Sequence, residues 1–183
     1  DNGMDRDIIE ILVSLAVLLP LGGTVFLMAF GKRIGEPIAG WIGTGTVALA
    51  FVGAAVAATD FLAGTGHPET IRWFEWLPAL GVDAALLWDP LSAVMTMVVT
   101  GVGALIHLYS IGYMHGDPRF GQFFTYLNLF ITSMLILVLA NNFAVLFVGW
   151  ELVGLSSYLL ISFWYEKPSA AAAGKKAFVV NRI

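Results

Sequence analysis

The chain contains five apolar stretches of about twenty residues or more, and these constrain its fold more than any other feature. They occupy residues 8–30, 38–59, 90–113, 121–140 and 143–165. An α-helix needs about twenty apolar residues to cross roughly 30 Å of hydrocarbon, whereas a membrane β-strand needs about ten residues of alternating polarity. With 58% apolar and 12% charged residues, the composition is also unlike that of soluble domains. The sequence therefore predicts an all-α integral membrane protein, a polytopic transmembrane helix bundle.

A sixth span is expected to start near residues 170–177. Apolar residues resume at Ala177, but the chain stops at Ile183, which is too soon for a helix to cross a bilayer. We therefore expect residues 1–183 to be the N-terminal part of one transmembrane domain. The first span follows a net acidic segment with no clear cleavage site, so we expect a retained helix and not a signal peptide.

The basic residues predict how the bundle is oriented. The segments after spans one, three and five carry six of them, whereas the opposite side carries only Arg6 and Arg72; the six are Lys32, Arg33, Arg119, Lys167, Lys175 and Lys176. Since the side with excess Lys and Arg faces the cytoplasm, the N-terminus is expected outside.

The longest loop, residues 60–89, is acidic and carries three tryptophans. We expect its acidic side chains to be solvated and Trp73, Trp76 and Trp88 to hold part of it at the headgroup level. At its end, Asp89 precedes Pro90, a pattern typical of a helix start, so we expect Asp89 to cap the third span.

One acidic residue, Glu151, lies within the fifth span. It is about 12 Å along the helix from Phe143 and about 21 Å from Tyr165, so its carboxylate cannot easily reach either membrane surface. Gly154 and Tyr158 share its helical face and offer space and a hydroxyl. Because ionisable residues inside a membrane are costly and are functional by default, Glu151 is predicted to carry protons. The alternative is a neutral Glu151 hydrogen-bonded between helices.

Other polar groups inside the predicted spans have two interpretations each. His107 has a near-neutral pKa that suits a proton relay, but a lone histidine near a helix end also fits a packing role. Arg182 or Lys176 could supply a cation that tunes Glu151. The fourth span carries Asn128, Thr132 and Ser133, for which we favour bonding across helices over a hydrated seam.

Several classes of chemistry have no signature in the sequence. There is no cysteine, glycine-rich phosphate loop, HExxH, haem or iron–sulfur ligand set, or nucleophile arrangement. We therefore expect no cofactor, metal or redox centre in this chain, and the lipid bilayer and protons, not nucleic acid, as its partners.

Four segments of the sequence resemble one family. The antiporter-like membrane subunits of respiratory complex I, especially the distal subunit of the L or chain 5 type, are similar to WDPLSAVMTMVVTGVGALIHLYSIGYMHGD, FFTYLNLFITSMLILVLANNF, FVGWELVGLSSYLLISFWY and AAAAGKKAFVVNRI. The resemblance runs from about Leu86 to the end of the chain, and the first two spans agree in hydropathy only.

The resemblance implies a proton-translocating subunit of NADH:quinone oxidoreductase without its own redox centre. NAD, FMN, iron–sulfur clusters and quinone are then expected in partner subunits, other complex I membrane subunits are the partners, and the bacterial inner membrane is the location. Glu151 matches the family's glutamate of helix five, whose lysine partner on a broken helix seven would lie beyond Ile183. Arg182 matches the basic residue of helix six.

Three alternatives remain on the sequence alone. Multi-subunit cation/proton antiporters and membrane-bound hydrogenases use related subunits with the same glutamate. A non-conducting membrane scaffold is the third, and in a scaffold Glu151 should tolerate replacement.

Overall fold

The computed structural model describes residues 4–182 and confirms the predicted helix bundle. Five long apolar helices in this part of the chain are able to cross a membrane by length and composition, and a shorter α6 follows them. The six α-helices are α1 (Arg6–Ile34), α2 (Ile38–Leu62), α3 (Pro90–Tyr113), α4 (Phe120–Val138), α5 (Phe143–Ile161) and α6 (Pro168–Val180).

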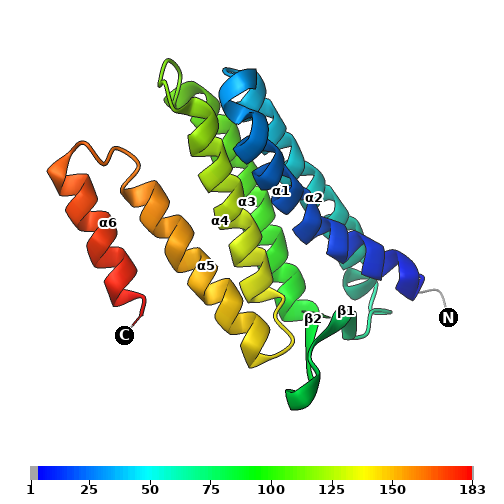
Figure 1. Ribbon diagram of the computed structural model, residues 1–183. Coiled ribbons are helices and arrows are strands. Elements are labelled where there is room, and N and C mark those ends of the chain that lie inside the picture. The colour runs from blue at the N-terminus through cyan, green and yellow to red at the C-terminus, as the bar shows by residue number, and fades with distance from the viewer. Residues whose placement is uncertain (1–3, 183) are drawn as a thin grey trace.

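Helix α4 lies at the centre of the bundle. It packs against α1, α2, α3 and α5, while α6 packs against the outer side of α5 (Figure 1). The turns α1–α2, α3–α4 and α5–α6 lie at one end of the bundle, and the C-terminal end of α6 points toward the other (Figure 1). The order of helices across the bundle therefore leaves α5 between α4 and α6.

Two glycine contacts explain how the helices come close together. A Cβ atom on Gly121 of α4 would lie 2.5 Å from the carbonyl oxygen of Gly31 on α1. A Cβ atom on Gly149 of α5 would lie 2.6 Å from the backbone nitrogen of Leu137. Small residues let backbones approach at helix interfaces in a membrane, so these two positions set the spacing of α4 from α1 and α5.

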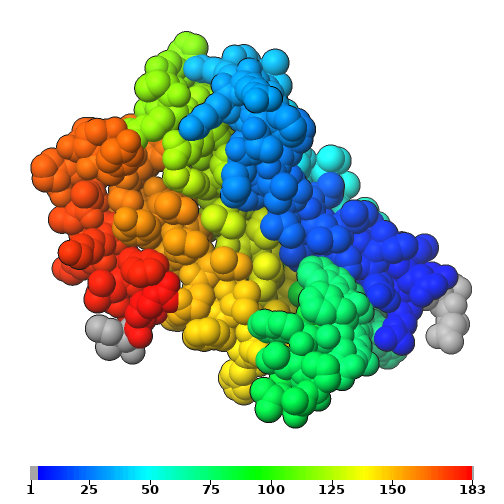
Figure 2. Space-filling model, in the orientation of Figure 1, coloured from blue at the N-terminus to red at the C-terminus, as the bar shows by residue number. Residues whose placement is uncertain are grey.

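The predicted loop 60–89 is mostly a β-hairpin. Strand β1 (Glu69–Leu77) pairs antiparallel with β2 (Val82–Trp88), and the short 3₁₀ helix η1 (Pro78–Leu80) with Gly81 at φ 63° joins them. Space-filling Figure 2 shows the hairpin beside α1 and the start of α5. The Trp73 indole donates a hydrogen bond to Ser14 of α1 at 3.0 Å.

The expectations for two residues of this segment were wrong. Trp88 does not present its ring to lipid headgroups, because only 1% of it is exposed and its ring centroid lies 6.0 Å from that of Phe61. Asp60 is not solvated either, because its carboxylate accepts hydrogen bonds from the Met4 N–H at 2.9 and 2.8 Å. Trp88 is thus buried where strand β2 packs on the end of α2, and Asp60 is buried where the end of α2 meets Met4.

The predicted cap at the start of α3 is confirmed. Asp89 accepts a hydrogen bond from the Ser92 N–H at 2.7 Å, and the Ser92 hydroxyl accepts one from the Asp89 N–H at 2.8 Å. This reciprocal pair is a capping box, which satisfies donors that the first turn of a helix leaves unpaired.

The predicted helix bounds are close to the observed ones, and the largest differences are at the C-terminal ends of α1, which runs four residues beyond the predicted Phe30, and of α5. The third span matches α3 residue for residue, whereas α5 ends at Ile161, four residues before the predicted Tyr165. Beyond Ile161 the Ser162 and Phe163 N–H groups bond in tight turns that lead to Pro168, the first residue of α6. The apolar run continues into this turn because the aromatic side chains of the turn pack there. Hydropathy therefore overestimates the length of α5.

Candidate functional site

Glu151 of α5 and Arg182, two residues after α6, form an ion pair. The Glu151 side chain is 25% exposed and that of Arg182 is 37% exposed. The Arg182 guanidinium also lies over the Phe178 ring, 4.2 Å from its centroid. A positive group on an aromatic face gains further electrostatic attraction, so Phe178 helps to hold the guanidinium near the carboxylate.

Asn181 fixes the end of α6 against α5. Its backbone carbonyl accepts a hydrogen bond from the Trp150 indole at 3.2 Å. Its side chain covers Gly154, where a Cβ atom would lie 2.2 Å from the Asn181 amide nitrogen. The space that the sequence indicated beside Gly154 is therefore filled by Asn181, and this contact places the next residue, Arg182, beside Glu151.

The other predicted site residues lie outside this pair. Lys176 is exposed on α6, and within residues 4–182 no ion pair includes it. The Tyr158 ring packs on Phe178 with centroids 5.5 Å apart. The structure thus brings Arg182, and not Lys176, to Glu151.

His107 forms a separate polar centre on α3. Its side chain is fully buried and contacts the Gly103 carbonyl at 2.8 Å through Nδ1 and the Asn128 Oδ1 at 2.9 Å through Nε2. Asn128 therefore bonds across helices as expected, whereas Thr132 and Ser133 donate to carbonyls of their own helix. No hydrogen bond joins His107 to Glu151 in the described part of the chain.

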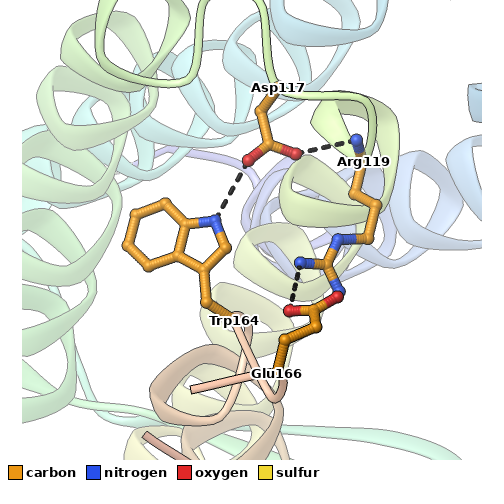
Figure 3. A network of polar contacts seen from close by, with 4 residues as sticks. All are labelled: Asp117, Arg119, Trp164 and Glu166. Carbon is orange, nitrogen blue, oxygen red and sulfur yellow. Dashed lines mark hydrogen bonds and ion pairs between the residues drawn. The ribbon is translucent and has the colours of Figure 1, made fainter.

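A network that the sequence analysis missed joins the α3–α4 and α5–α6 turns (Figure 3). Asp117 accepts hydrogen bonds from the Arg119 N–H at 2.8 Å and from the Trp164 indole at 3.0 Å. The Arg119 guanidinium donates to Glu166 at 3.1 Å and lies over the Phe163 and Tyr165 rings. The only sequence signal was a cluster of charged and aromatic residues in two loops on the same predicted side.

Hydrogen bonds and charge at the turns on this end of the bundle shift three pKa values. The backbone N–H of Glu166 and, against desolvation, the Arg119 guanidinium lower the pKa of Glu166. Desolvation alone would lower the pKa of Arg119, but Glu166 outweighs it and the pKa is raised. At the α1–α2 turn, the Gly116 N–H, 3.0 Å from Glu36, lowers the pKa of that carboxyl, and His115 adds to the effect.

The geometry defines a class of protein. A bundle of membrane-length helices carries a partly exposed acid–base pair between α5 and the end of α6. This combination is that of a membrane subunit of the antiporter type. Such a subunit carries ionisable groups inside the bilayer, where they are rare without a use.

Comparison with known proteins narrows the class. Residues 73–124 match the family described as NADH-ubiquinone oxidoreductase (complex I), chain 5 N-terminus. Residues 140–183 match the family described as NADH:quinone oxidoreductase/Mrp antiporter, TM. The chain belongs to the antiporter-like membrane subunits of NADH:quinone oxidoreductase.

Individual relatives agree with this family. The chain is 49% identical over 173 residues to NADH-quinone oxidoreductase subunit L of Mycobacterium tuberculosis, covering 92% of this chain and 27% of the relative. It is 42% identical over 174 residues to subunit L of Escherichia coli, covering 94% and 28%. The chain therefore spans about a quarter of the length of these relatives.

Two solved structures share the fold. The Mrp complex from Dietzia sp. DQ12-45-1b superposes with a TM-score of 0.61 at 30% identity, covering 84% of this chain and 16% of that one. The membrane-bound sulfane sulfur reductase, an archaeal respiratory membrane complex, superposes with a TM-score of 0.77 at 23% identity, covering 91% and 33%. The second likeness concerns the fold alone.

Proposed function

We propose that this chain is part of a proton-translocating membrane subunit of NADH:quinone oxidoreductase and that Glu151 carries protons. The observation that supports this most directly is the ion pair between Glu151 and Arg182 within the bundle. The family membership adds to it, because the named relatives are subunits of that oxidoreductase.

The pair has the chemistry that a proton carrier needs. A guanidinium beside a carboxylate favours the ionised form of Glu151, while removal from water favours the protonated form. A movement of Arg182 away from Glu151 therefore favours proton uptake, and its return favours release. The position of Arg182 just after α6 makes it the tuning cation in this proposal, with Lys176 as the alternative cation.

His107 is the second proposed proton-binding group. It lies on α3, apart from the Glu151 pair, in a buried polar centre with Asn128. A histidine changes charge near neutral pH, so it suits a relay that operates under the same conditions as the carboxylate.

The proposed setting rests on the family and on the positions of the basic residues. We place the subunit in a bacterial inner membrane with other complex I membrane subunits, its N-terminus outside and its basic turns in the cytoplasm. The driving redox chemistry then lies in partner subunits that hold NAD, FMN, iron–sulfur clusters and quinone. The described part of this chain contributes proton-binding side chains inside the bilayer.

A second candidate is a subunit of a multi-subunit cation/proton antiporter. It is favoured by the 30% identity to a chain of the Mrp complex and by the second family match, whose description includes the Mrp antiporter. A membrane-bound hydrogenase subunit and a non-conducting scaffold are the further alternatives. Dependence of proton uptake on NADH would favour the oxidoreductase over the antiporter and the hydrogenase, and the scaffold is tested by replacing Glu151.

The test is NADH-energised proton uptake by inverted membrane vesicles that contain the assembled complex. Glu151→Gln keeps the shape of the side chain but cannot carry a proton, and we expect uptake to fall sharply while the complex still assembles. The matched control is Glu75→Gln, a surface carboxylate in the hairpin. Unchanged uptake by Glu151→Gln would refute the proposal and favour the scaffold.

A further inference from the structure

Four helices meet at the buried centre around His107. Gly43 of α2 lies close to the imidazole, Phe124 and Asn128 of α4 contact it, and Gly103 precedes it by one turn on α3. Helix α1 reaches the centre through Gly23, where a Cβ atom would lie 2.5 Å from the Asn128 amide nitrogen and 2.8 Å from the Thr46 hydroxyl. The centre is thus closely packed on every side.

The hydrogen bonds of this centre run in one direction. The Thr46 hydroxyl donates to the Gly43 carbonyl at 2.9 Å, so its oxygen accepts from the Asn128 amide nitrogen at 3.3 Å. The amide oxygen of Asn128 then faces His107 Nε2 at 2.9 Å, and the Gly103 carbonyl faces Nδ1 at 2.8 Å. Both ring nitrogens of His107 therefore face oxygen acceptors.

A neutral imidazole has one N–H and cannot donate to both oxygens, whereas an imidazolium donates from both nitrogens. The arrangement therefore suits protonated His107. No ionisable side chain balances this charge: Gly43, Phe124 and Asn128 cannot titrate, and none of the ion pairs in residues 4–182 includes His107. Burial of an unpaired charge is costly. Burial therefore favours the neutral imidazole, whereas the two oxygen acceptors favour the imidazolium.

The same atoms also satisfy a neutral His107 if the chain of hydrogen bonds reverses. The Thr46 hydroxyl rotates to donate to the Asn128 amide oxygen, and the turned amide donates from its nitrogen to the bare Nε2. Nδ1–H continues to donate to the Gly103 carbonyl. The Gly43 carbonyl loses the Thr46 hydroxyl, but it lies inside helix α2, where carbonyl groups accept from backbone N–H groups. The two states differ by the one proton on Nε2, and no proton moves between residues in the rotations.

We propose that His107, Asn128 and Thr46 form a proton-binding unit with two hydrogen-bonding states, selected by the proton on His107 Nε2. His107 binds the proton, and Asn128 and Thr46 are positioning residues whose polarity reverses with it. The unit deepens the proposed function and rests on it, since it assigns a second proton site to α2, α3 and α4. It makes no contact with the Glu151 pair, so the two sites are testable separately.

The experiment measures NADH-energised proton uptake by the assembled complex in inverted vesicles from about pH 5.5 to 8.5, a range that brackets histidine titration. His107→Gln retains a donor and an acceptor but binds no proton. We expect it to remove one inflection from the pH profile of the wild type. A profile of unchanged shape, whether or not the rate falls uniformly, would overturn the proposal, because it would leave His107 with a packing role.

Two further variants test the positioning residues and cover a failure of His107→Gln to assemble. Asn128→Asp places a carboxylate on Nε2, so we expect the inflection to move upward by about one pH unit or more; no shift, or a downward one, overturns the proposal. Thr46→Val removes one member of the chain and is expected to shift the inflection. Its matched control is Thr44→Val, because the Thr44 hydroxyl donates only to Gly40 of its own helix at 2.8 Å.

The result for Glu151→Gln in the same assay separates this inference from the proposed function. If Glu151→Gln abolishes uptake and the His107 and Asn128 variants keep the wild-type profile, the second site is wrong and the proton function stands. If uptake by Glu151→Gln is unchanged, the function assigned to Glu151 is wrong whatever the histidine variants do.

Discussion

Arg182 reaches Glu151 because Asn181, the residue before it, covers Gly154 on the same helix as the carboxylate. The Asn181 carbonyl is further held by the Trp150 indole at 3.2 Å. The ion pair is thus formed by two short stretches, 150–154 on α5 and 181–182 after α6. Any change in the angle between these helices changes the distance between the two charges.

Replacement of Arg182 should weaken proton uptake more than replacement of either lysine of α6. Arg182→Gln leaves the carboxylate of Glu151 without its cation. Loss of one partner from a fully buried pair lowers the stability of the folded protein by about 3–5 kcal/mol. Since both side chains are partly exposed, we expect the lower end of that range or less. Arg182→Lys keeps the charge and should retain part of the uptake.

Lys176→Gln decides between the two candidate cations in the same vesicle assay. Lys175→Gln is the matched control, because Lys175 is its exposed neighbour on α6. A loss of uptake in Lys176→Gln that equals the loss in Arg182→Gln, with Lys175→Gln near wild type, would contradict the assignment of Arg182.

Gly149→Ala should destabilise the bundle more than substitution of a glycine that faces open space. The new Cβ would lie 2.6 Å from the backbone nitrogen and 2.7 Å from the Cα of Leu137, and backbone atoms cannot move aside as a flexible side chain can. Overpacking of this kind costs about 1–3 kcal/mol. Thermal unfolding of the complex in detergent measures the effect.

The matched control is Gly45→Ala, at a position where a Cβ would have no neighbour within 4 Å. Alanine is the better helix former by about 1 kcal/mol, so this variant should be at least as stable as the wild type. Equal loss of stability in both variants would show that the α4–α5 contact is not tight at Gly149.

Asp89→Ala should lower stability by about 1 kcal/mol, the usual effect of losing an N-cap side chain. The Asp89 carboxylate accepts from the Ser92 N–H, so the variant removes this half of the capping box, whereas the backbone N–H of residue 89 can still donate to the Ser92 hydroxyl. Asp89→Asn keeps an acceptor and should lose much less. An equal loss in Asp89→Ala and Asp89→Asn in thermal unfolding would mean that the charge, and not the cap, is what matters there.

The helices, the cap and the acidic residue of α5 could be predicted because each depends on neighbours in sequence. Helix α3 begins at Pro90 as predicted, since Asp89 and Pro90 act on the adjacent turn. The apolar length of each span likewise needs no knowledge of the other spans.

The contacts between elements could not be predicted in the same way. Trp88 and Asp60 looked like exposed loop residues, but Trp88 packs on Phe61 of α2 and the Asp60 carboxylate accepts from the Met4 N–H, and both contacts join distant parts of the chain. The choice of Arg182 over Lys176 depends on where Asn181 meets Gly154, which no local pattern specifies. His107 and Asn128 were both noted as polar, but their contact joins two helices and needed the packed bundle.

Protonation of Glu166 should loosen the contact between the α3–α4 and α5–α6 turns. Its own backbone N–H and Arg119 hold the pKa of Glu166 below the ordinary 4.5, against desolvation. A carboxyl with a lowered pKa contributes stability above its unfolded pKa and loses it as the pH falls through the folded pKa. The contact should therefore be complete at neutral pH and weaken only in acid, below the ordinary value.

Glu166→Gln mimics the protonated carboxyl at neutral pH. We expect faster backbone hydrogen exchange in residues 162–168, measured on the assembled complex, because the Arg119 guanidinium loses its charged acceptor. The matched control is Glu75→Gln in the hairpin, for which exchange in 162–168 should not change. Since the pair is exposed, added salt should reproduce part of the effect in the wild type. If Glu166→Gln exchanges like the wild type, the contacts of Trp164 with Asp117 and of Phe163 and Tyr165 with Arg119 hold the turns together without the ion pair.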